Sequence, residues 1–334
     1  MSKTTTPTIY DVAATANVSI ATVSRVINNL GKVKPETRTA VLEAIDSLGF
    51  IPKADARARA IRTQRRIGVI TPFFTAPSFV QRLRGVAAAL GPTPYELVIY
   101  TVTNSKHLSN YLDTLPLTGN LDGLIILSLE LDDHYVQRLL DHHLETVLVE
   151  YPHSLLSSVE IDNEDGGKQA ADYFYKKGYR RFAFVGDTST AEYGIHPISL
   201  RLNGFRKELL HLGGKLPDTQ ILIAPYDINK TRERAMVFLQ NQELPLAIFA
   251  ATDLQAISII QAARQLDLKI PDDIAVMGFD DLDMAEYFNL TTIRQHLDES
   301  GEIAVEMLLS RLANPGRTVQ MSKLPLEIIE RGTV

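Results

Sequence analysis

The stretch TIYDVAATANVSIATVSRVINN, which runs from Thr8 to Asn29, has the pattern of two short helices joined by a tight turn. Thr8 suits the N-cap of a helix over residues 9–16, because its side-chain oxygen can accept a hydrogen bond from a first-turn amide. Ser19 suits the N-cap of a second helix over residues 20–28 in the same way. Apolar residues recur at helical spacing and give each helix one buried face. The stretch therefore predicts a helix-turn-helix unit.

A third helix is predicted in the next segment, KPETRTAVLEAIDSLGF, over residues 34–50. Pro35 suits the first turn of a helix, and Gly49 suits its C-terminal end. Three short helices make a small all-α domain, for which we predict the bounds 1–52. A linker over residues 53–66 then leads into the remainder of the chain.

Charge is distributed unevenly along the chain, although the net charge is only −6. Residues 1–66 hold 11 Lys and Arg against 5 Asp and Glu, a charge of +6, whereas the remainder holds 23 against 35, a charge of −12. A basic segment joined to an acidic body is typical of a module that binds a polyanion. The alternative is a helical bundle with a solvated basic face.

In a helix-turn-helix unit, the second helix enters the major groove of DNA and its N-terminal residues reach the base edges. Arg25 can fork onto guanine O6 and N7, whereas Ile20 and Ala21 offer only apolar contacts, for example to a thymine methyl. Phosphate contacts are expected from hydroxyl and amide side chains. The predicted DNA-binding residues of this domain are Thr8, Ser19, Ile20, Ala21, Thr22, Ser24, Arg25, Asn28 and Asn29.

The same segments carry a resemblance to a known family. The stretch over residues 8–29 and the stretch VKPETRTAVLEAIDSLGFIP over residues 33–52 resemble the DNA-binding headpiece of the LacI/GalR family of bacterial transcription regulators. The match covers the headpiece almost residue for residue and extends more weakly along the chain. It implies a repressor that binds a palindromic operator as a homodimer and responds to a small effector.

The arginine-rich segment PKADARARAIRTQRR, over residues 52–66, falls on the hinge of that family. The resemblance implies that two hinges form helices on the operator, where a leucine from each one wedges into the minor groove. Ala56, Arg57 and Arg59 lie on the hinge motif, and Arg59 stands at the leucine position. Arginine inserts into a narrow minor groove, so we predict shallower bending and a preference for an A·T-rich centre. A register that places the wedge at Ile61 is the alternative.

From Ile67 onward, strand-like apolar runs alternate with amphipathic helical segments in two series. This pattern is typical of parallel sheets covered on both faces, and it predicts two doubly wound lobes. The resemblance implies a core like that of periplasmic sugar-binding proteins, with crossovers near Asp162, Leu290 and Val319. The predicted fold class is α/β, with an N-terminal all-α helix-turn-helix headpiece and a two-lobed, doubly wound core of periplasmic-binding-protein type. The predicted core spans residues 67–334, with lobe 1 over about 67–161 and 291–318 and lobe 2 over about 162–290 and 319–334.

Ligands of such folds bind at the carboxyl ends of parallel strands. Strand ends in this sequence carry acidic, hydroxyl and aromatic side chains, which are the groups that bind sugars. The residues at these ends are Phe73, Phe74, Glu150, Tyr151, Thr252 and Asp280. Each of them also has an ordinary alternative role, such as helix capping by Asp280.

The resemblance adds further effector-binding candidates and makes Asp280 the effector-contact aspartate. It places Arg201, in the motif RLNGF, in the cleft, where the guanidinium would bind ligand hydroxyls or a carboxylate. The other candidates are Ser78 and Phe79 at the start of the first core helix, Tyr226 or Asp227 as a side wall, and His196 just before the Arg201 helix.

Several classes of protein are disfavoured by what the sequence lacks. The chain has no cysteine, which excludes disulfides and thiolate metal sites, and no catalytic motif is present. We therefore expect no enzyme activity, metal or cofactor. The longest apolar runs are of strand length and the N-terminus is polar, so we expect a cytoplasmic protein without membrane contact.

The expected partners are double-stranded operator DNA, a second copy of the chain, and a monosaccharide or disaccharide effector. A regulator that responds to a nucleobase or to a partner protein is the first alternative. A solute-binding protein is a less favoured one.

Overall fold

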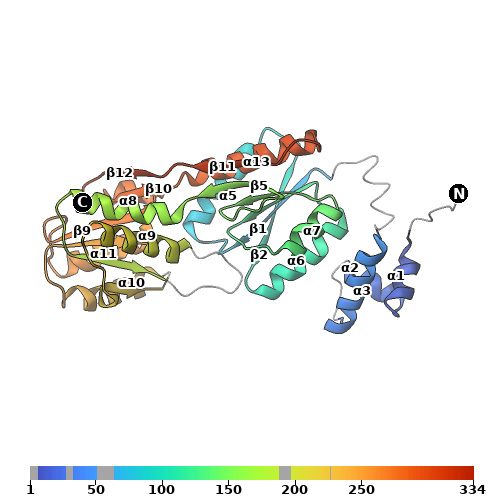
Figure 1. The fold of residues 1–334 in the computed structure, drawn as a ribbon, viewed down its shortest axis with the longest axis horizontal. Coiled ribbons are helices and arrows are strands. Elements are labelled where there is room, and N and C mark those ends of the chain that lie inside the picture. Colours follow the sequence, from blue (N-terminus) through green and yellow to red (C-terminus); the bar gives the residue numbers. More distant parts are fainter. Residues whose placement is uncertain (1–6, 28–32, 51–63, 188–196, 226) are drawn as a thin grey trace. The chain divides into compact units, whose positions relative to one another are not determined.

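The structure is a computed structural model of the 334-residue chain, and it describes residues 7–27, 33–50, 64–187, 197–225 and 227–334 (Figure 1). The chain divides into two compact units. Unit 1 comprises Met1–Phe74, Ala87–Ser158 and Ala304–Gln320, and unit 2 comprises Thr75–Val86, Val159–Ile303 and Met321–Val334. Most of the predicted linker, residues 53–66, lies outside the described residues.

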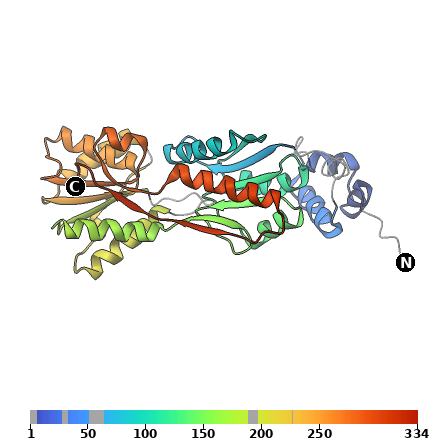
Figure 2. The same ribbon diagram turned by 90° about the horizontal axis from the view of Figure 1, so that it is seen from above.

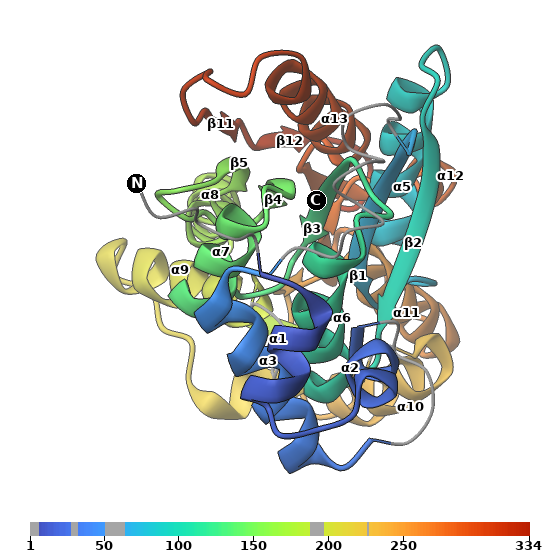
Figure 3. The same cartoon turned by 90° about the vertical axis from the view of Figure 1, so that its right-hand side faces the viewer.

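Three helices form the N-terminal domain, namely α1 (Ile9–Thr15), α2 (Ile20–Ile27) and α3 (Pro35–Leu48) (Figure 3). Val12 of α1, Val23 of α2 and Val41 of α3 are fully buried in one shared apolar cluster. Gly49 ends α3 with a φ of 59°, a left-handed conformation that glycine adopts without strain. The predicted helix-turn-helix unit and its third helix are confirmed.

The first sheet has six strands in the order β11-β5-β4-β3-β1-β2. Strand β1 pairs in parallel with β2 and β3, and β3 pairs in parallel with β4. The strands are β1 (Arg66–Pro72), β2 (Glu96–Val102), β3 (Gly123–Leu127), β4 (Glu145–Val149), β5 (Ser157–Ile161) and β11 (Met321–Leu324). The helices between them are α5 (Pro77–Leu90), α6 (Ser105–Thr118) and α7 (Asp133–Asp141).

The second sheet has six strands in the order β12-β10-β9-β8-β6-β7. In the described part of this sheet, β12 runs antiparallel to β10, and the other neighbouring strands run parallel. The strands are β6 (Phe182–Gly186), β7 (Ile221–Ile223), β8 (Leu246–Ala250), β9 (Ile274–Asp280), β10 (Thr291–Arg294) and β12 (Glu327–Ile329). The helices that accompany this sheet are α8 (Asn163–Lys176), α9 (Pro197–His211), α10 (Ile228–Leu239), α11 (Asp253–Gln265) and α12 (Asp283–Tyr287). Helix α13 (Leu297–Ala313), the long red helix in Figure 2, begins in unit 2 and continues into unit 1 from Ala304 onward.

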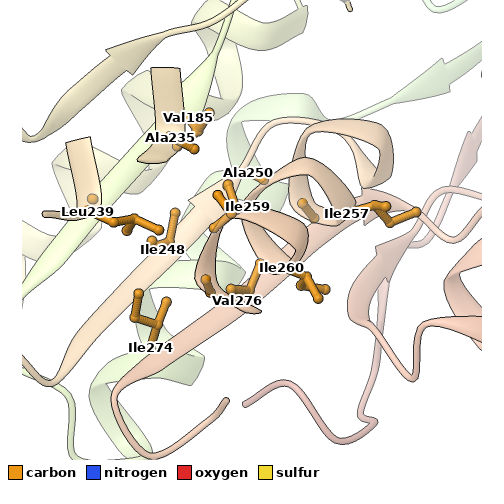
Figure 4. Packing of buried hydrophobic residues seen from close by; sticks show 14 of the residues in the cluster. Val185, Ala235, Leu239, Ile248, Ala250, Ile257, Ile259, Ile260, Ile274 and Val276 are labelled. Carbon is orange, nitrogen blue, oxygen red and sulfur yellow. The ribbon is translucent and has the colours of Figure 1, made fainter. Parts of the chain in front are cut away.

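The apolar core on one face of the second sheet fixes the strands that carry the candidate site (Figure 4). Ile248 of β8 and Val276 of β9 are fully buried, and Ile259 and Ile260 of α11 are each 1% exposed. Burial of such a side chain stabilises the fold by about 1.5–3 kcal/mol. The near-continuous apolar strands thus form parallel sheets, and the predicted α/β fold class is confirmed.

Two segments do not lie in the sheet that the predicted lobe boundaries imply. Residues 291–294, expected in lobe 1, form β10 and pair with β9 in the second sheet. Residues 321–324, expected in lobe 2, belong to unit 2, but they form β11 beside β5 in the first sheet, where the Ser158 amide donates to the Gln320 carbonyl over 2.9 Å. The reason is physical: each segment pairs an edge that β9 or β5 would otherwise leave open, and apolar periodicity does not encode the choice of edge.

Candidate effector site and DNA-reading surface

The second helix of the headpiece presents a surface suited to reading DNA. Ser19 begins α2 by accepting a hydrogen bond from the Thr22 amide over 3.2 Å, and its hydroxyl lies 2.9 Å from the Thr22 hydroxyl. Val23 is buried, so the opposite side of α2 presents Ile20, Ala21 and Arg25 to solvent. The exposed Ile20 in the first turn of α2 and the exposed Arg25 in its last turn match the groups that contact base edges.

The remaining predicted DNA-binding residues are less exposed or lie elsewhere. Thr8 donates to the Asp11 carboxylate from its amide over 2.7 Å and from its hydroxyl over 2.6 Å, so it begins α1. Thr22 and Ser24 are half-buried. Asn28, Asn29, Ala56, Arg57 and Arg59 lie outside the described residues.

In unit 2, Arg201 is the centre of a buried polar cluster. Its side chain extends from α9, is almost fully buried, and donates from Nε to Asn163 Oδ1 over 2.8 Å and from Nη1 to the Ala251 carbonyl over 2.6 Å. The guanidinium carbon lies 3.6 Å from the centre of the Phe279 ring, a favourable cation–π distance. These contacts fix the guanidinium at the carboxyl ends of β8 and β9.

Asp280 and Gln295 complete this cluster, which we call the Arg201 cluster. Asp280 Oδ1 lies 3.7 Å from Arg201 Nη1 and accepts a hydrogen bond from Gln295 Nε2 over 2.5 Å. Gln295 Oε1 is buried and has no hydrogen-bond partner within the described part of the chain. The cluster therefore combines a cation, an anion and an amide, and its charges balance.

Close packing of two helices places Arg201. A Cβ atom on Gly167 of α8 would lie 2.0 Å from the Arg201 carbonyl oxygen, and one on Gly204 of α9 would lie 1.9 Å from the Glu164 carbonyl oxygen. Only glycine permits such an approach of two helix backbones. The helix pair thus delivers the arginine to the strand ends.

Thr252 and Asp253 lie at the start of α11. Thr252 accepts a hydrogen bond from the Gln255 amide over 3.3 Å and so caps this helix. Asp253 is fully buried and accepts from the Thr292 hydroxyl over 2.5 Å and from the Leu282 amide over 2.7 Å. Burial, and next the negative charge of Asp280, raise the pKa of Asp253 well above its ordinary value.

In unit 1, polar side chains gather after the strands of the first sheet. The Ser128 hydroxyl, just after β3, donates to the Glu150 carboxylate, just after β4. Both residues have positive φ values, 52° and 74°. The Tyr151 hydroxyl donates to Glu130 over 3.1 Å. Such strained backbone at strand ends is typical of binding sites.

The aromatic candidates differ in environment. Phe73, just after β1, is 55% exposed, and Phe74 is 40% exposed. Exposed phenylalanines at a strand end can cover the apolar face of a sugar ring. Ser78 and Phe79 lie in the first turn of α5, and the Arg82 guanidinium lies 5.9 Å from the Phe79 ring centre.

Arg201 and Asp280 are the pair of predicted effector residues that the structure brings into contact in unit 2. Asp227 is exposed and caps α10 by accepting from the Lys230 amide over 2.9 Å. His196 and Tyr226 lie outside the described residues. Sequence reasoning missed Ser128, Asn163 and Gln295. Gln295 directly follows β10, so the strand-end rule would have found it.

Within the ranges that the structure describes, no group of three His, Cys, Asp or Glu side chains is placed to hold a metal ion. No helix in those ranges is long and apolar enough to cross a bilayer.

Comparison with known proteins finds relatives of both the N-terminal domain and the α/β core. Residues 8–53 match the family model of bacterial regulatory proteins, lacI family, and residues 171–334 match a periplasmic binding protein-like domain. The ribose operon repressor of Escherichia coli strain K12 is 32% identical over 340 residues, which cover 98% of this chain and 99% of that protein.

Two further matches cover almost the whole chain. The HTH-type transcriptional repressor PurR of Photobacterium profundum is 30% identical over 333 residues, which cover 98% of each chain. Among solved structures, the complex of the transcriptional regulator CelR with cellobiose aligns with a TM-score of 0.70 and 27% identity, over 98% of this chain and 100% of that one.

Proposed function

The chain belongs to the lacI family of bacterial regulatory proteins and is a DNA-binding repressor rather than an enzyme. On that premise, we propose that a sugar controls its affinity for DNA. The proposed operator is an inverted repeat, which two copies of the chain bind together. The proposed effector is a neutral monosaccharide or disaccharide. Genes of sugar metabolism are the proposed targets.

The headpiece supports the DNA-binding part of this proposal. The exposed side chains at the start of α2 are of the kind that contact base edges, and Arg25 supplies a forked donor for guanine. Two such helices, related by a two-fold axis, would contact successive major grooves of a palindrome. The hinge interpretation of Ala56, Arg57 and Arg59 remains part of this proposal.

The Arg201 cluster is the single observation that carries the effector part. Its guanidinium and carboxylate balance each other, so an anionic or cationic ligand would bring an unbalanced charge into a buried place. Sugar hydroxyls both donate and accept, and they suit Asp280, Arg201 and the buried Gln295 oxygen together. The proposal therefore favours neutral polyhydroxylated ligands over phosphorylated ones.

Two relatives support the sugar class by their names. The 32% identical relative is named for a ribose operon, and the aligned CelR structure contains cellobiose. The relative named PurR is 30% identical, so relatives of similar identity differ in name. A nucleobase effector is therefore the second candidate.

The test combines a binding panel with a DNA assay. Calorimetry of the full chain against D-ribose, hexoses, cellobiose, sugar phosphates and nucleobases should give binding with a neutral sugar and none with the sugar phosphates. The bound sugar should change the affinity of the chain for a selected inverted-repeat operator by about 5–150-fold in fluorescence anisotropy. Binding of nucleobases alone would replace the sugar with the second candidate.

A further inference from the structure

Asp280 is held in a backbone conformation that is rare for any residue other than glycine. Its φ is 120°, and the φ of the next residue, Asp281, is 53°. Residues with a Cβ rarely adopt such values, and they persist only when surrounding contacts hold them. Contacts with the surrounding structure must therefore hold this turn.

Two arginines hold Asp281. Asp281 Oδ2 accepts from Arg294 Nε over 2.8 Å, and Asp281 Oδ1 accepts from Arg331 Nη2 over 2.8 Å. The Asp281 side chain is only 8% exposed, whereas that of Arg294 is 38% exposed and that of Arg331 is 17% exposed. Arg331 is thus the more buried of its two cationic partners.

Arg331 is itself fixed in the segment that follows β12. Its Nη1 donates to the Leu290 carbonyl over 2.8 Å, and its amide donates to the Thr291 hydroxyl over 2.9 Å. Two residues on, the buried Thr333 hydroxyl donates to the Val276 carbonyl over 2.7 Å and accepts from the Thr291 amide over 2.8 Å. The guanidinium therefore occupies a set position before any ligand arrives.

Asp253 holds the other side of the turn. Its Oδ2 accepts from the Leu282 amide, the residue that directly follows Asp281, over 2.7 Å. The two acidic side chains differ in partners, because Asp253 accepts from the neutral Leu282 amide and Thr292 hydroxyl, whereas Asp281 accepts from two arginines. The turn at Asp280 and Asp281 is thus held by ion pairs at Asp281 and by a buried hydrogen bond at Leu282.

We propose that Arg331, with Arg294, is a positioning residue of the effector site, because it clamps Asp281 and so aims the Asp280 carboxylate at the ligand. This inference rests on the proposed function, since it takes Asp280 as an effector contact. Arg331 itself touches no ligand in this scheme. Its role is to keep the strained turn from relaxing and rotating Asp280 away from Arg201 and Gln295.

The first test needs no effector. Hydrogen exchange by mass spectrometry is measured on the full chain, for a peptide that contains Leu282 and for peptides that contain Val276 and Thr291. Arg331→Ala should speed exchange at Leu282 by at least about tenfold, because the turn opens locally. Arg331→Lys should restore part of the protection, since an ammonium can reach one carboxylate oxygen.

Two matched controls separate the clamp from general stabilisation of the tail. Glu330→Gln and Lys177→Ala each break the 2.7 Å ion pair between Glu330, next to Arg331, and Lys177, at the end of α8, without touching Asp281. Both should leave exchange at Leu282 unchanged. If Arg331→Ala speeds hydrogen exchange at Val276 and Thr291 as much as at Leu282, Arg331 only stabilises the C-terminal segment. That result would overturn the proposed role of Arg331 at Asp281.

The second test measures selectivity with D-ribose and 2-deoxy-D-ribose as probes. If the Asp280 carboxylate points at the ligand, the chain should bind D-ribose more tightly than 2-deoxy-D-ribose. The ratio of the dissociation constant for 2-deoxy-D-ribose to that for D-ribose should fall toward one in Arg331→Ala but stay unchanged in Glu330→Gln. An unaltered ratio would overturn the proposal. If neither probe binds the unmodified chain, the ribose form of the proposed function fails, while the exchange experiment still decides whether Arg331 clamps the turn.

Discussion

Arg201 illustrates how one residue can serve a site only because its partners are fixed. Its planar fork bonds Asn163 Oδ1 and the Ala251 carbonyl and lies over Phe279. Lysine keeps the charge but has neither the fork nor the flat face. Position and charge at this residue can therefore be separated by experiment.

Arg201→Lys should weaken binding of the effector by about 10–100-fold, which corresponds to the loss of one or two charge-assisted hydrogen bonds. Operator affinity without effector should be unchanged. Calorimetry measures the first quantity and anisotropy the second. Arg206→Lys is the control, because Arg206 lies on the same helix but pairs with Asp218 at the surface. Equal losses in the two variants would contradict a specific role for Arg201.

Asp253 gives a prediction about pH. Burial raises its pKa well above the ordinary value of 3.8 in the folded chain, so the folded chain keeps a proton that the unfolded chain releases. The free energy of unfolding should therefore fall as pH rises from about 4 through the folded pKa, and then level off.

Asp253→Asn cannot ionise and should lack this fall, although it should be less stable near pH 4 because one of two acceptor oxygens is lost. Urea unfolding at a series of pH values measures both effects. Parallel pH curves for the variant and the unmodified chain would show that Asp253 does not titrate in this window.

At the scale of elements, α2 and the α8–α9 pair each position one function. Arg25→Ala should cost about 1–3 kcal/mol of binding to the selected operator, but much less on random duplex, because a base contact is lost. Competition anisotropy measures both. Lys34→Ala, which removes an equal charge at the start of α3, is the control and should affect both duplexes alike.

Gly204→Ala tests the helix pair. The added methyl would lie 1.9 Å from the Glu164 carbonyl oxygen, so α8 and α9 must separate. We expect a loss of about 1–3 kcal/mol in the free energy of unfolding and weaker effector binding, because Arg201 moves with α9. Urea unfolding and calorimetry measure the two effects. Gly316→Ala, where a Cβ would meet nothing within 4 Å, should change neither.

The sequence predicts where helices and strands lie better than it predicts which strands pair with each other. Apolar periodicity and capping residues placed α1, α2 and α3 closely, because these signals are local. The destinations of β10 and β11 did not follow, since strand pairing depends on edges far away in the sequence. The strained turn at Asp280 and Asp281 also escaped prediction, because only distant arginines reveal it.

At the scale of the whole molecule, the proposed dimer fixes the geometry of the operator. Two chains should bind one inverted repeat, and mass photometry of the complex should show this ratio. Inserting five base pairs between the half-sites turns one of them to the opposite face of the duplex and should reduce affinity to near that for random DNA. Tight binding of a single half-site by one chain would contradict the dimer.

The order of the strands has a consequence for synthesis. Residues 321–324 complete the edge of one sheet, residues 327–329 complete the edge of the other, and the arginine that grips Asp281 comes two residues later. A nascent chain halted on the ribosome after α13 therefore exposes two open edges and an unsupported turn. The headpiece, by contrast, precedes these segments in the chain, and local capping and periodicity specify its three helices. The proposed effector site can therefore be complete only after residues 321–331 have been made, well after the headpiece has emerged.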